Sequence, residues 1–237
     1  MSAQYILLWL EAPLQAWGAD SKFGRRDSLR FPTKSGVAGL MLSALGASGE
    51  QRELLETLAP LKQTVISYAR RKGGKKKEPE PLLIDFHMVG AGYDDSNPWE
   101  KLLIPKTSEG KKAVGGGTKM TYRYYLQDAR FAVIIEVPDS LVIALTEAIR
   151  NPVYDLYLGR KNCVPTEFIY QGVFGDEQAA LEKAGQIADE KGDFIEDFRV
   201  IDGERGDKGE VMTLNDIPVQ FGAFKKYKDR RVTVIPA

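Results

Sequence analysis

The sequence predicts an α+β protein with a ferredoxin-like core. Segments follow one another to about residue 174 in the order strand, helix, strand, long insertion, strand, helix, loop, strand, which is the order of that fold. Of the 237 residues, 43% are hydrophobic and 28% are charged, as in ordinary globular proteins. We therefore expect one large domain or two small ones around a buried core.

The first elements are marked by an apolar run and by helix caps. Residues 4–10 (QYILLWL) predict a strand buried on both faces or nearly so, and a polar loop follows at 18–30. Thr33 is placed to cap a helix with apolar residues at helical spacing, and Gly46 is placed to end it. A second amphipathic stretch lies at 50–58 and stops before a proline.

The middle of the chain alternates between ordered and polar segments. Residues 63–69 alternate as a half-buried strand does. The basic stretch 70–81 (RRKGGKKKEPEP) cannot bury a core, so it predicts a mobile excursion. After an ordered segment at 82–89, residues 90–121 predict a second long excursion, which in a compact domain is usually functional or disordered.

The rest of the chain predicts a strand, a capped amphipathic helix, another strand and an acidic helix-like piece. These lie at 129–137, 139–150, about 167–174 and 176–191. Asp139 or Ser140 is expected to cap the first of the two helices. Short strands and loops are expected at 194–237.

The net charge of zero conceals a gradient along the chain. Residues 62–123 carry 13 basic and 7 acidic side chains, whereas residues 124–237 carry 14 and 20. The acidic excess is concentrated at 176–216, with 13 acidic and 5 basic residues. This separation predicts one surface that faces a polyanion and another that faces solvent or a basic partner, although two solvated loops would give the same pattern.

Several kinds of protein are excluded by what the sequence lacks. One cysteine, Cys163, cannot form an internal disulfide or a thiolate zinc cage, and one histidine, His87, cannot form a two-histidine metal site. The opening residues show neither a signal peptide nor an apolar run long enough to span a membrane. We therefore expect a cytoplasmic protein with no metal, no cofactor and no membrane partner.

Two segments could bind phosphate or nucleic acid. The helix start at 32–36 (PTKSG) offers backbone N–H groups after three arginines, which suits a phosphate oxygen, although an ordinary cap explains it almost as well. In 157–165 (YLGRKNCVP), Tyr157 can stack on a base, Gly159 permits a close backbone approach, and the residues after it are donors. Cys163 is expected to pack beneath that turn.

Two other groups of residues have a functional and a structural interpretation. His87 could act as a general acid or base, but a strand histidine beside Phe86 and Met88 more often has a structural neighbour. Tyr122, Tyr124 and Tyr125 could stack on bases, although core or rim packing is commoner for such residues.

Five blocks in fixed order together carry a family resemblance. They are LEAPLQAWG (10–18), RFPTKSGVAGLMLSALG (30–46), DFHMVGA (85–91), YRYYLQDARFAV (122–133) and NPVYDLYLGRKNCVP (151–165). The chain resembles the CasD-like family of the RAMP superfamily, the 5′-handle-binding subunits of the type I-E CRISPR surveillance complex Cascade. The resemblance covers about 10–175.

The resemblance implies a fold and a role. It implies an RRM-related RAMP core at 1–175, with a basic thumb insertion at about 70–127, and a small β-rich part at 176–237. Such subunits cap the 5′ handle of the CRISPR RNA and kink it with the thumb where the guide begins. They are non-catalytic, serve antiviral defence, sit beside the large subunit and the adjacent backbone subunit, and meet target DNA through the assembled complex.

The resemblance also implies which residues contact RNA. It implies that Arg25, Arg26, Lys34 and Ser35 contact the phosphates of the handle. Arg123 is implied to contact the RNA near the junction of handle and spacer. The pocket for the terminal bases of the handle is formed by Tyr157, Leu158, Gly159, Arg160, Lys161, Asn162 and Cys163.

Two other functions are kept open at this point. A CasD-related subunit of another CRISPR subtype is a metal-independent repeat endoribonuclease, which here would use His87 with Tyr122 or Lys119. An adaptor that binds no nucleic acid is the third possibility.

Overall fold

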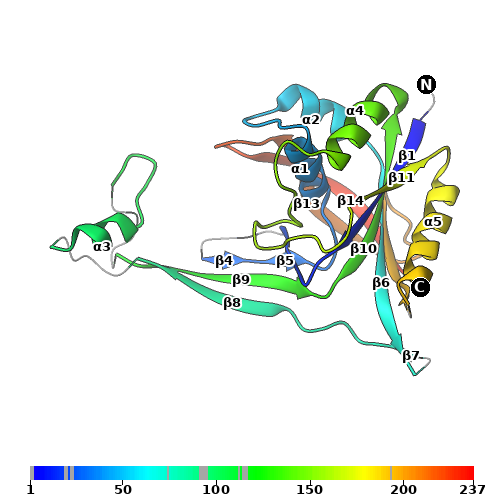
Figure 1. Ribbon diagram of the computed structural model, residues 1–237, viewed down its shortest axis with the longest axis horizontal. Helices are drawn as coiled ribbons and strands as arrows, with labels where there is room; N and C mark the ends of the chain where they lie inside the picture. Colours follow the sequence, from blue (N-terminus) through cyan, green and yellow to red (C-terminus); the bar gives the residue numbers. More distant parts are fainter. Residues whose placement is uncertain are drawn as a thin grey trace.

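The fold is built on a large antiparallel sheet. The computed structural model describes residues 3–18, 21, 24–73, 75–90, 96–111, 113, 117–192 and 194–237. In this part of the chain, eight strands form the main sheet, seven of them in the order β11-β1-β10-β6-β12-β14-β13, and β7 pairs with β6. Figure 1 shows the sheet with helices on both sides and a long arm projecting from it.

The first four strands of the sheet have the ferredoxin-like arrangement. They are β11 (Tyr170–Phe174), β1 (Ala3–Glu11), β10 (Arg130–Pro138) and β6 (Gln63–Lys72). Each neighbouring pair is antiparallel, with the first and third strands of the chain order in the centre. The fold class predicted from the sequence is therefore confirmed. β6 is buried continuously from Gln63 to Tyr68 rather than on one face, because both faces of the sheet are covered there.

Helices cover both faces of this sheet because alternate side chains of a strand point to opposite faces. Ile6, Leu8 and Leu10 of β1 share a core with α1 (Lys34–Ala44), α2 (Arg52–Leu58) and α4 (Asp139–Arg150). On the other face, Leu7 and Trp9 pack with α5 (Glu177–Glu190). In the described part of the chain, no helix is long and apolar enough to cross a membrane.

The helix caps are partly as predicted. Thr33 caps α1 through its side chain, which accepts a hydrogen bond from the Gly36 N–H at 3.2 Å. Gly46 adopts a φ of +70° just after the helix, so it ends α1 as expected. α4 differs, since Pro138 occupies the N-cap position in place of Asp139 or Ser140.

The C-terminal strands are longer than the sequence suggested. They are β12 (Phe194–Asp202), β13 (Glu210–Gln220) and β14 (Lys226–Pro236), with 9, 11 and 11 residues. The prediction of short strands was wrong because these strands continue the main sheet beyond β6 and share the core of α1. The division at residue 175 stays a prediction about domains, although one sheet runs through both parts.

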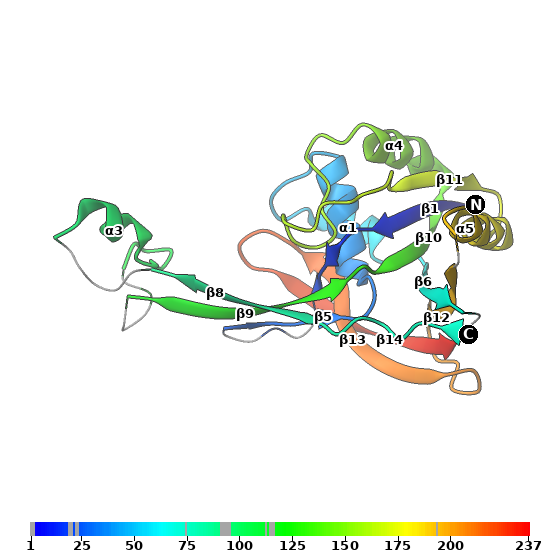
Figure 2. The ribbon, with the colours of Figure 1, turned by 60° about the horizontal axis from the view of Figure 1, so that its bottom comes forward.

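The arm, residues 83–127, is a two-stranded ribbon with a short helix towards its far end (Figure 2). Its elements are β8 (Leu83–Val89), α3 (Pro98–Leu103) and β9 (Lys119–Gln127). The structureless excursion expected at 90–121 therefore contains a helix, capped by Asn97. Residues 91–95, 112 and 114–116 of that prediction lie outside the described residues.

Short strands attach the arm to the rest of the molecule. β2 (Leu14–Gln15) and β4 (Arg25–Arg26) pair with β9, and β3 (Trp17–Gly18) pairs with β5 (Ser28–Leu29). The polar loop predicted at 18–30 is therefore partly ordered as strand.

The basic segment after residue 70 forms strand in its described residues 70–72 and 75–76, outside the arm. β6 continues to Lys72 and pairs with β7 (Lys75–Lys76), and the Lys77 N–H donates to the Arg70 carbonyl at 2.8 Å. The excursion predicted at 70–81 therefore contains strand, and its mobility stays a prediction. Polar residues can extend a strand whose first half is fixed by a core, which composition alone does not reveal.

Candidate nucleic-acid interface

The root of the arm brings together two sequence blocks that are far apart in the chain. Strand β9 pairs with β8 on one side and, in parallel, with the short strand β4 on the other. This register places Arg25 beside Tyr122 and Arg26 beside Arg123. Arg25 and Arg26 are exposed and Arg123 is half-buried. These three arginines, all assigned to RNA from the resemblance, therefore lie on neighbouring strands, Arg25 on the face of Tyr122 and Arg26 with Arg123 on the opposite face.

One face of the arm is apolar and exposed. Directly paired residues share a face, and along β8 and β9 one such face carries Ile84, Phe86, Met88, Met120, Tyr122 and Tyr124. Tyr122 and Phe86 are 50% and 51% exposed, and their ring centroids are 5.2 Å apart. Exposed rings beside cations are what single-stranded RNA requires for stacking.

Arg25 links this apolar face to the basic root. Its guanidinium lies 4.8 Å from the ring centroid of Tyr124. Its Nε donates to Asp27 Oδ1 at 2.8 Å, which fixes the side chain in place and raises the pKa of Arg25. Because Arg25 is fully charged and held over a ring, it can meet a phosphate while the ring meets a base.

The other face of the arm is polar and carries His87. Thr121 lies opposite His87 in the ladder, and Arg123 lies opposite Asp85. Tyr122 is on the opposite face from His87, so these two side chains cannot act together on one 2′-hydroxyl. Lys119 is on the same face, paired with Val89. No group of three potential metal ligands occurs among the described residues.

Arg160 ties the 157–163 loop to the arm. Its two terminal nitrogens donate to the Tyr124 carbonyl at 3.1 Å and the Arg26 carbonyl at 2.8 Å. The guanidinium also lies 4.6 Å from the ring centroid of Tyr125, which is 1% exposed. Arg160 therefore holds β9, β4 and the loop together and acts as a positioning residue.

The 157–163 loop is a tight turn with a buried base and an exposed tip. Leu158 and Cys163 are fully buried, and their backbones are joined by a hydrogen bond of 2.8 Å. Burial raises the pKa of the Cys163 thiol, as the packing prediction requires. At the tip, Lys161 and Asn162 are exposed, so they are the loop side chains that can meet a ligand. Tyr157 is half-buried beside them.

Gly159 adopts a conformation that the loop could not have with another residue. Its φ is +100°, and an added Cβ would lie 1.7 Å from the carbonyl oxygen of Ala16. The Ala16 N–H in turn donates to the Leu158 carbonyl at 3.1 Å. The close backbone approach predicted at Gly159 is therefore an approach to this chain's own first segment.

Lys34 is not available to a phosphate, which corrects the sequence prediction. Its ammonium pairs with Asp202 at 3.0 Å, and its side chain is 8% exposed. The Lys34 N–H donates to Asp216 at 2.8 Å, so the helix start is already occupied by a carboxylate of this chain. Arg230 pairs with both aspartates. Ser35 is half-buried beside this network. Because Asp216 already accepts from the helix start, a phosphate is not expected to bind at Ser35.

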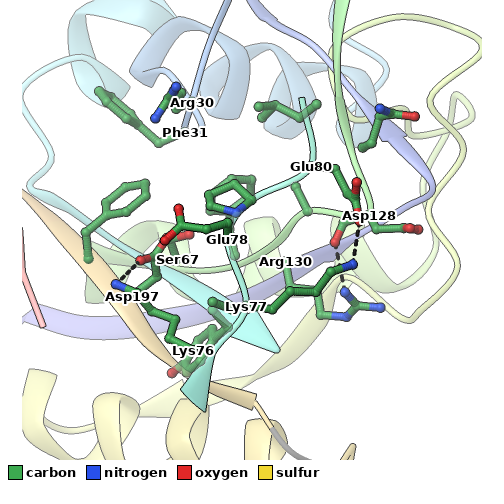
Figure 3. Close-up of a pocket in the computed structure, with 18 of the residues that line it drawn as sticks. Arg30, Phe31, Ser67, Lys76, Lys77, Glu78, Glu80, Asp128, Arg130 and Asp197 are labelled. Atoms are coloured by element: carbon green, nitrogen blue, oxygen red, sulfur yellow. Dashed lines mark hydrogen bonds and ion pairs between the residues drawn. The ribbon is translucent and has the colours of Figure 1, made fainter. Parts of the chain in front are cut away.

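The third arginine of the 18–30 loop lies at a separate cavity. Figure 3 shows this cavity of about 810 Å³ between segment 76–82 and the sheet, with Arg30 and Phe31 above it. The cation of Lys76 at its base pairs with Asp197 at 2.7 Å. Arg30 therefore does not join the cluster of arginines around β4.

Two features of the site could not be read from the sequence. The division of the tyrosines between a buried Tyr125 and an exposed Tyr122 needed the register of β8 and β9, although their alternation along 121–126 was a signal for it. The neutralisation of the Lys34 ammonium depends on Asp202, 168 residues further along the chain.

The comparisons with known proteins agree with this architecture. A ferredoxin-like sheet with a projecting arm places the chain in the RAMP class, and its fold matches a chain of a "CRISPR RNA-guided surveillance complex" with a TM-score of 0.69. That chain is 25% identical, and the match covers 98% of this chain and 90% of that one. A second structure, "Crystal structure of Cas protein", gives a TM-score of 0.61 at 28% identity, covering 98% and 95%.

The family follows from the sequence match. Residues 5–234 match the family described as CRISPR-associated protein (Cas_Cas5), and the chain belongs to this family. The "CRISPR system Cascade subunit CasD" of Escherichia coli (strain K12) is 30% identical over 182 residues, which are 75% of this chain and 75% of that protein. The resemblance seen in the five sequence blocks is thereby confirmed.

Proposed function

We propose that this chain is a non-catalytic CRISPR RNA-binding subunit of a type I-E surveillance complex, acting in antiviral defence in the cytoplasm. It caps the 5′ handle of the CRISPR RNA, and its arm kinks the RNA where the guide begins. It sits beside the large subunit and the adjacent backbone subunit and meets target DNA through the assembled complex. The names of the Escherichia coli relative and of the structurally similar complex support this proposal.

The observation that carries the proposal is the convergence at the root of the arm. Strand β4, strand β9 and the 157–163 loop are joined there by ladder pairs and by the Arg160 hydrogen bonds. The cluster offers cations for phosphates, rings for bases and an exposed loop tip for base edges. These are the three kinds of contact that single-stranded RNA requires.

The residues of the site divide into two roles in this proposal. Of the residues that the resemblance assigns to RNA, those that contact it are Arg25, Arg26, Arg123, Tyr157, Lys161 and Asn162. The groups that shape the pocket from beneath are Leu158, Gly159, Arg160 and Cys163. Lys34 and Ser35 are left out because the carboxylates of the C-terminal strands close that helix start.

Affinity for handle RNA tests the proposal. The double variant Arg25→Gln, Arg26→Gln of the full chain should bind labelled single-stranded handle RNA about tenfold more weakly. The negative slope of log K against log salt should become shallower by about 1.4. The matched double variant Lys225→Gln, Lys226→Gln removes two exposed cations elsewhere and should leave binding almost unchanged. Equal affinity of the two double variants would contradict the proposal.

A cleavage assay tests the non-catalytic part separately. Cleavage at a 2′-hydroxyl needs a base and a cation close together. Tyr122 lies on the opposite face of the arm from His87, whereas Lys119 shares the face of His87, so His87 with Lys119 is the pair that the assay tests. We expect repeat RNA to stay intact when incubated with the full chain without metal. Cutting at one defined position, lost in His87→Ala, would overturn this part and favour the endoribonuclease.

A further inference from the structure

A second basic feature lies at the opposite end of the molecule from the arm. It is the 70–77 ribbon, formed by the end of β6 and by β7, of which the structure describes residues 70–73 and 75–77 (Figure 1). The buried part of β6 ends at Tyr68, and the described residues of the ribbon are exposed. The core therefore does not explain why the strand continues outward.

The pairing in this ribbon places like charges opposite each other. Arg71 lies opposite Lys76, and Lys72 lies opposite Lys75. Like charges directly across a ladder destabilise it. A ribbon of this kind is disfavoured in isolation and becomes favourable when an anion neutralises it.

The chain neutralises only part of this charge. Lys76 pairs with Asp197 at 2.7 Å, and Lys77 pairs with Glu80. Among the described residues, no carboxylate pairs with Arg71, Lys72 or Lys75. Three exposed cations at the tip are thus open to an outside anion.

The ribbon is held in a fixed direction. The Lys76–Asp197 pair joins it to β12 (Figure 3). The Asp197 side chain is only 15% exposed, so β12 holds this carboxylate in place. The guanidinium of Arg70 lies 5.5 Å from the ring centroid of Phe194, which also belongs to β12. These two contacts orient the three open cations before any ligand binds.

The chemistry of the ribbon differs from that of the arm. Residues 70–77 contain no aromatic side chain, so they lack the ring platforms that the arm offers to unpaired bases. A two-stranded β-ribbon fits the major groove of a duplex, and its cations can reach the phosphates on either side. We propose that the 70–77 ribbon binds the phosphate backbone of double-stranded nucleic acid, independently of RNA binding by the arm.

Duplex binding by the full chain tests this. The probe is a mixed-sequence DNA duplex of about two helical turns, compared with a duplex RNA of the same length and with single-stranded handle RNA. The variant is Arg71→Gln, Lys72→Gln, Lys75→Gln. We expect at least about tenfold weaker duplex binding and a salt slope smaller by about 2.7, with handle RNA binding unchanged.

A matched variant separates a site from a net-charge effect. Lys225→Gln, Lys226→Gln, Lys228→Gln removes the same charge from another exposed segment. Unchanged duplex affinity in the ribbon variant would overturn the proposal, and so would an equal loss in the matched variant. If only duplex DNA loses affinity, the ligand is DNA, and if both duplexes do, A-form and B-form backbones are both accepted. The measurement with handle RNA tests the proposed function alone. Failure of duplex binding therefore leaves the proposed function standing, and failure of handle RNA binding leaves the duplex proposal standing.

Discussion

Gly159 shows how one residue sets the position of a binding loop. We expect Gly159→Ala to lower the free energy of unfolding by more than about 2 kcal/mol, because a positive φ and a backbone clash act together. An added Cβ would meet the Ala16 carbonyl oxygen at 1.7 Å. Urea unfolding of the full chain measures this.

The control is a glycine without such a constraint. Gly39 lies inside α1, and an added Cβ there meets no atom within 4 Å. Gly39→Ala should raise the free energy of unfolding by up to about 1 kcal/mol, as alanine is the better helix former. If both variants changed the free energy of unfolding in the same direction, the proposed constraint at Gly159 would be contradicted.

Arg160 is predicted to act through geometry more than through charge. Arg160→Lys keeps the cation, but a single ammonium cannot reproduce both carbonyl hydrogen bonds and the contact with Tyr125. We expect the free energy of unfolding to fall by about 1–2 kcal/mol and handle RNA affinity to fall with it. Lys161→Gln, at the exposed tip, should lower RNA affinity and leave unfolding unchanged. The reverse pattern would contradict these assignments.

At the scale of elements, Glu11 of β1 joins its own strand to β10 and to the end of α5 through Trp9, Arg130 and Lys191. Burial alone would raise the pKa of Glu11, but the Trp9 indole hydrogen bond and the charges of Arg130 and Lys191 outweigh it and lower that pKa below 4.5. A carboxylate with a lowered pKa in the folded state stabilises the fold above the unfolded pKa. This contribution is lost as pH falls through the lower, folded value.

The pH dependence of unfolding therefore distinguishes Glu11 from an exposed pair. Glu11→Gln should cost about 1–3 kcal/mol near neutral pH, and its difference from the wild type should shrink as pH falls below 4.5. Glu136 pairs with Lys62, which is 77% exposed. Glu136→Gln should cost less than about 1 kcal/mol. A pH-independent cost at Glu11 would contradict the prediction.

The apolar face of the arm should matter for binding and little for folding. Tyr122→Leu with Phe86→Leu removes two rings that are about half exposed, so the free energy of unfolding should change by no more than about 1–1.5 kcal/mol. RNA affinity should fall by about 1–3 kcal/mol for each base that loses its stacking partner. The control is Phe224→Leu, a ring 76% exposed on another hairpin. Wild-type RNA affinity in the double variant would rule out stacking on this face.

At the scale of the whole molecule, local patterns predicted most of the core. The apolar run at 4–10, the Thr33 cap and the helix at 139–150 all have signals within a few residues, and the structure has each of them. The C-terminal strands were expected to be short because their polar residues look like loop when the sheet edge at β6 is not known.

The candidate site was predictable where it depends on residue type and not where it depends on long-range pairing. Arg25, Arg26 and Arg123 could be named from the sequence, but their meeting depends on the β4–β9 register. Lys34 appeared free because nothing near it in the chain is acidic. Its partners come from strands at the other end of the sequence.

RNA contact at the root of the arm is tested most directly by photo-crosslinking. The full chain is bound to handle RNA carrying 5-iodouridine, irradiated, digested and mapped by mass spectrometry. We predict crosslinks in peptides spanning 119–127 and 157–163, where exposed rings and the loop tip meet the bases. Crosslinks confined to α4, α5 or the C-terminal strands, with none in those two peptides, would contradict an RNA site at the root of the arm.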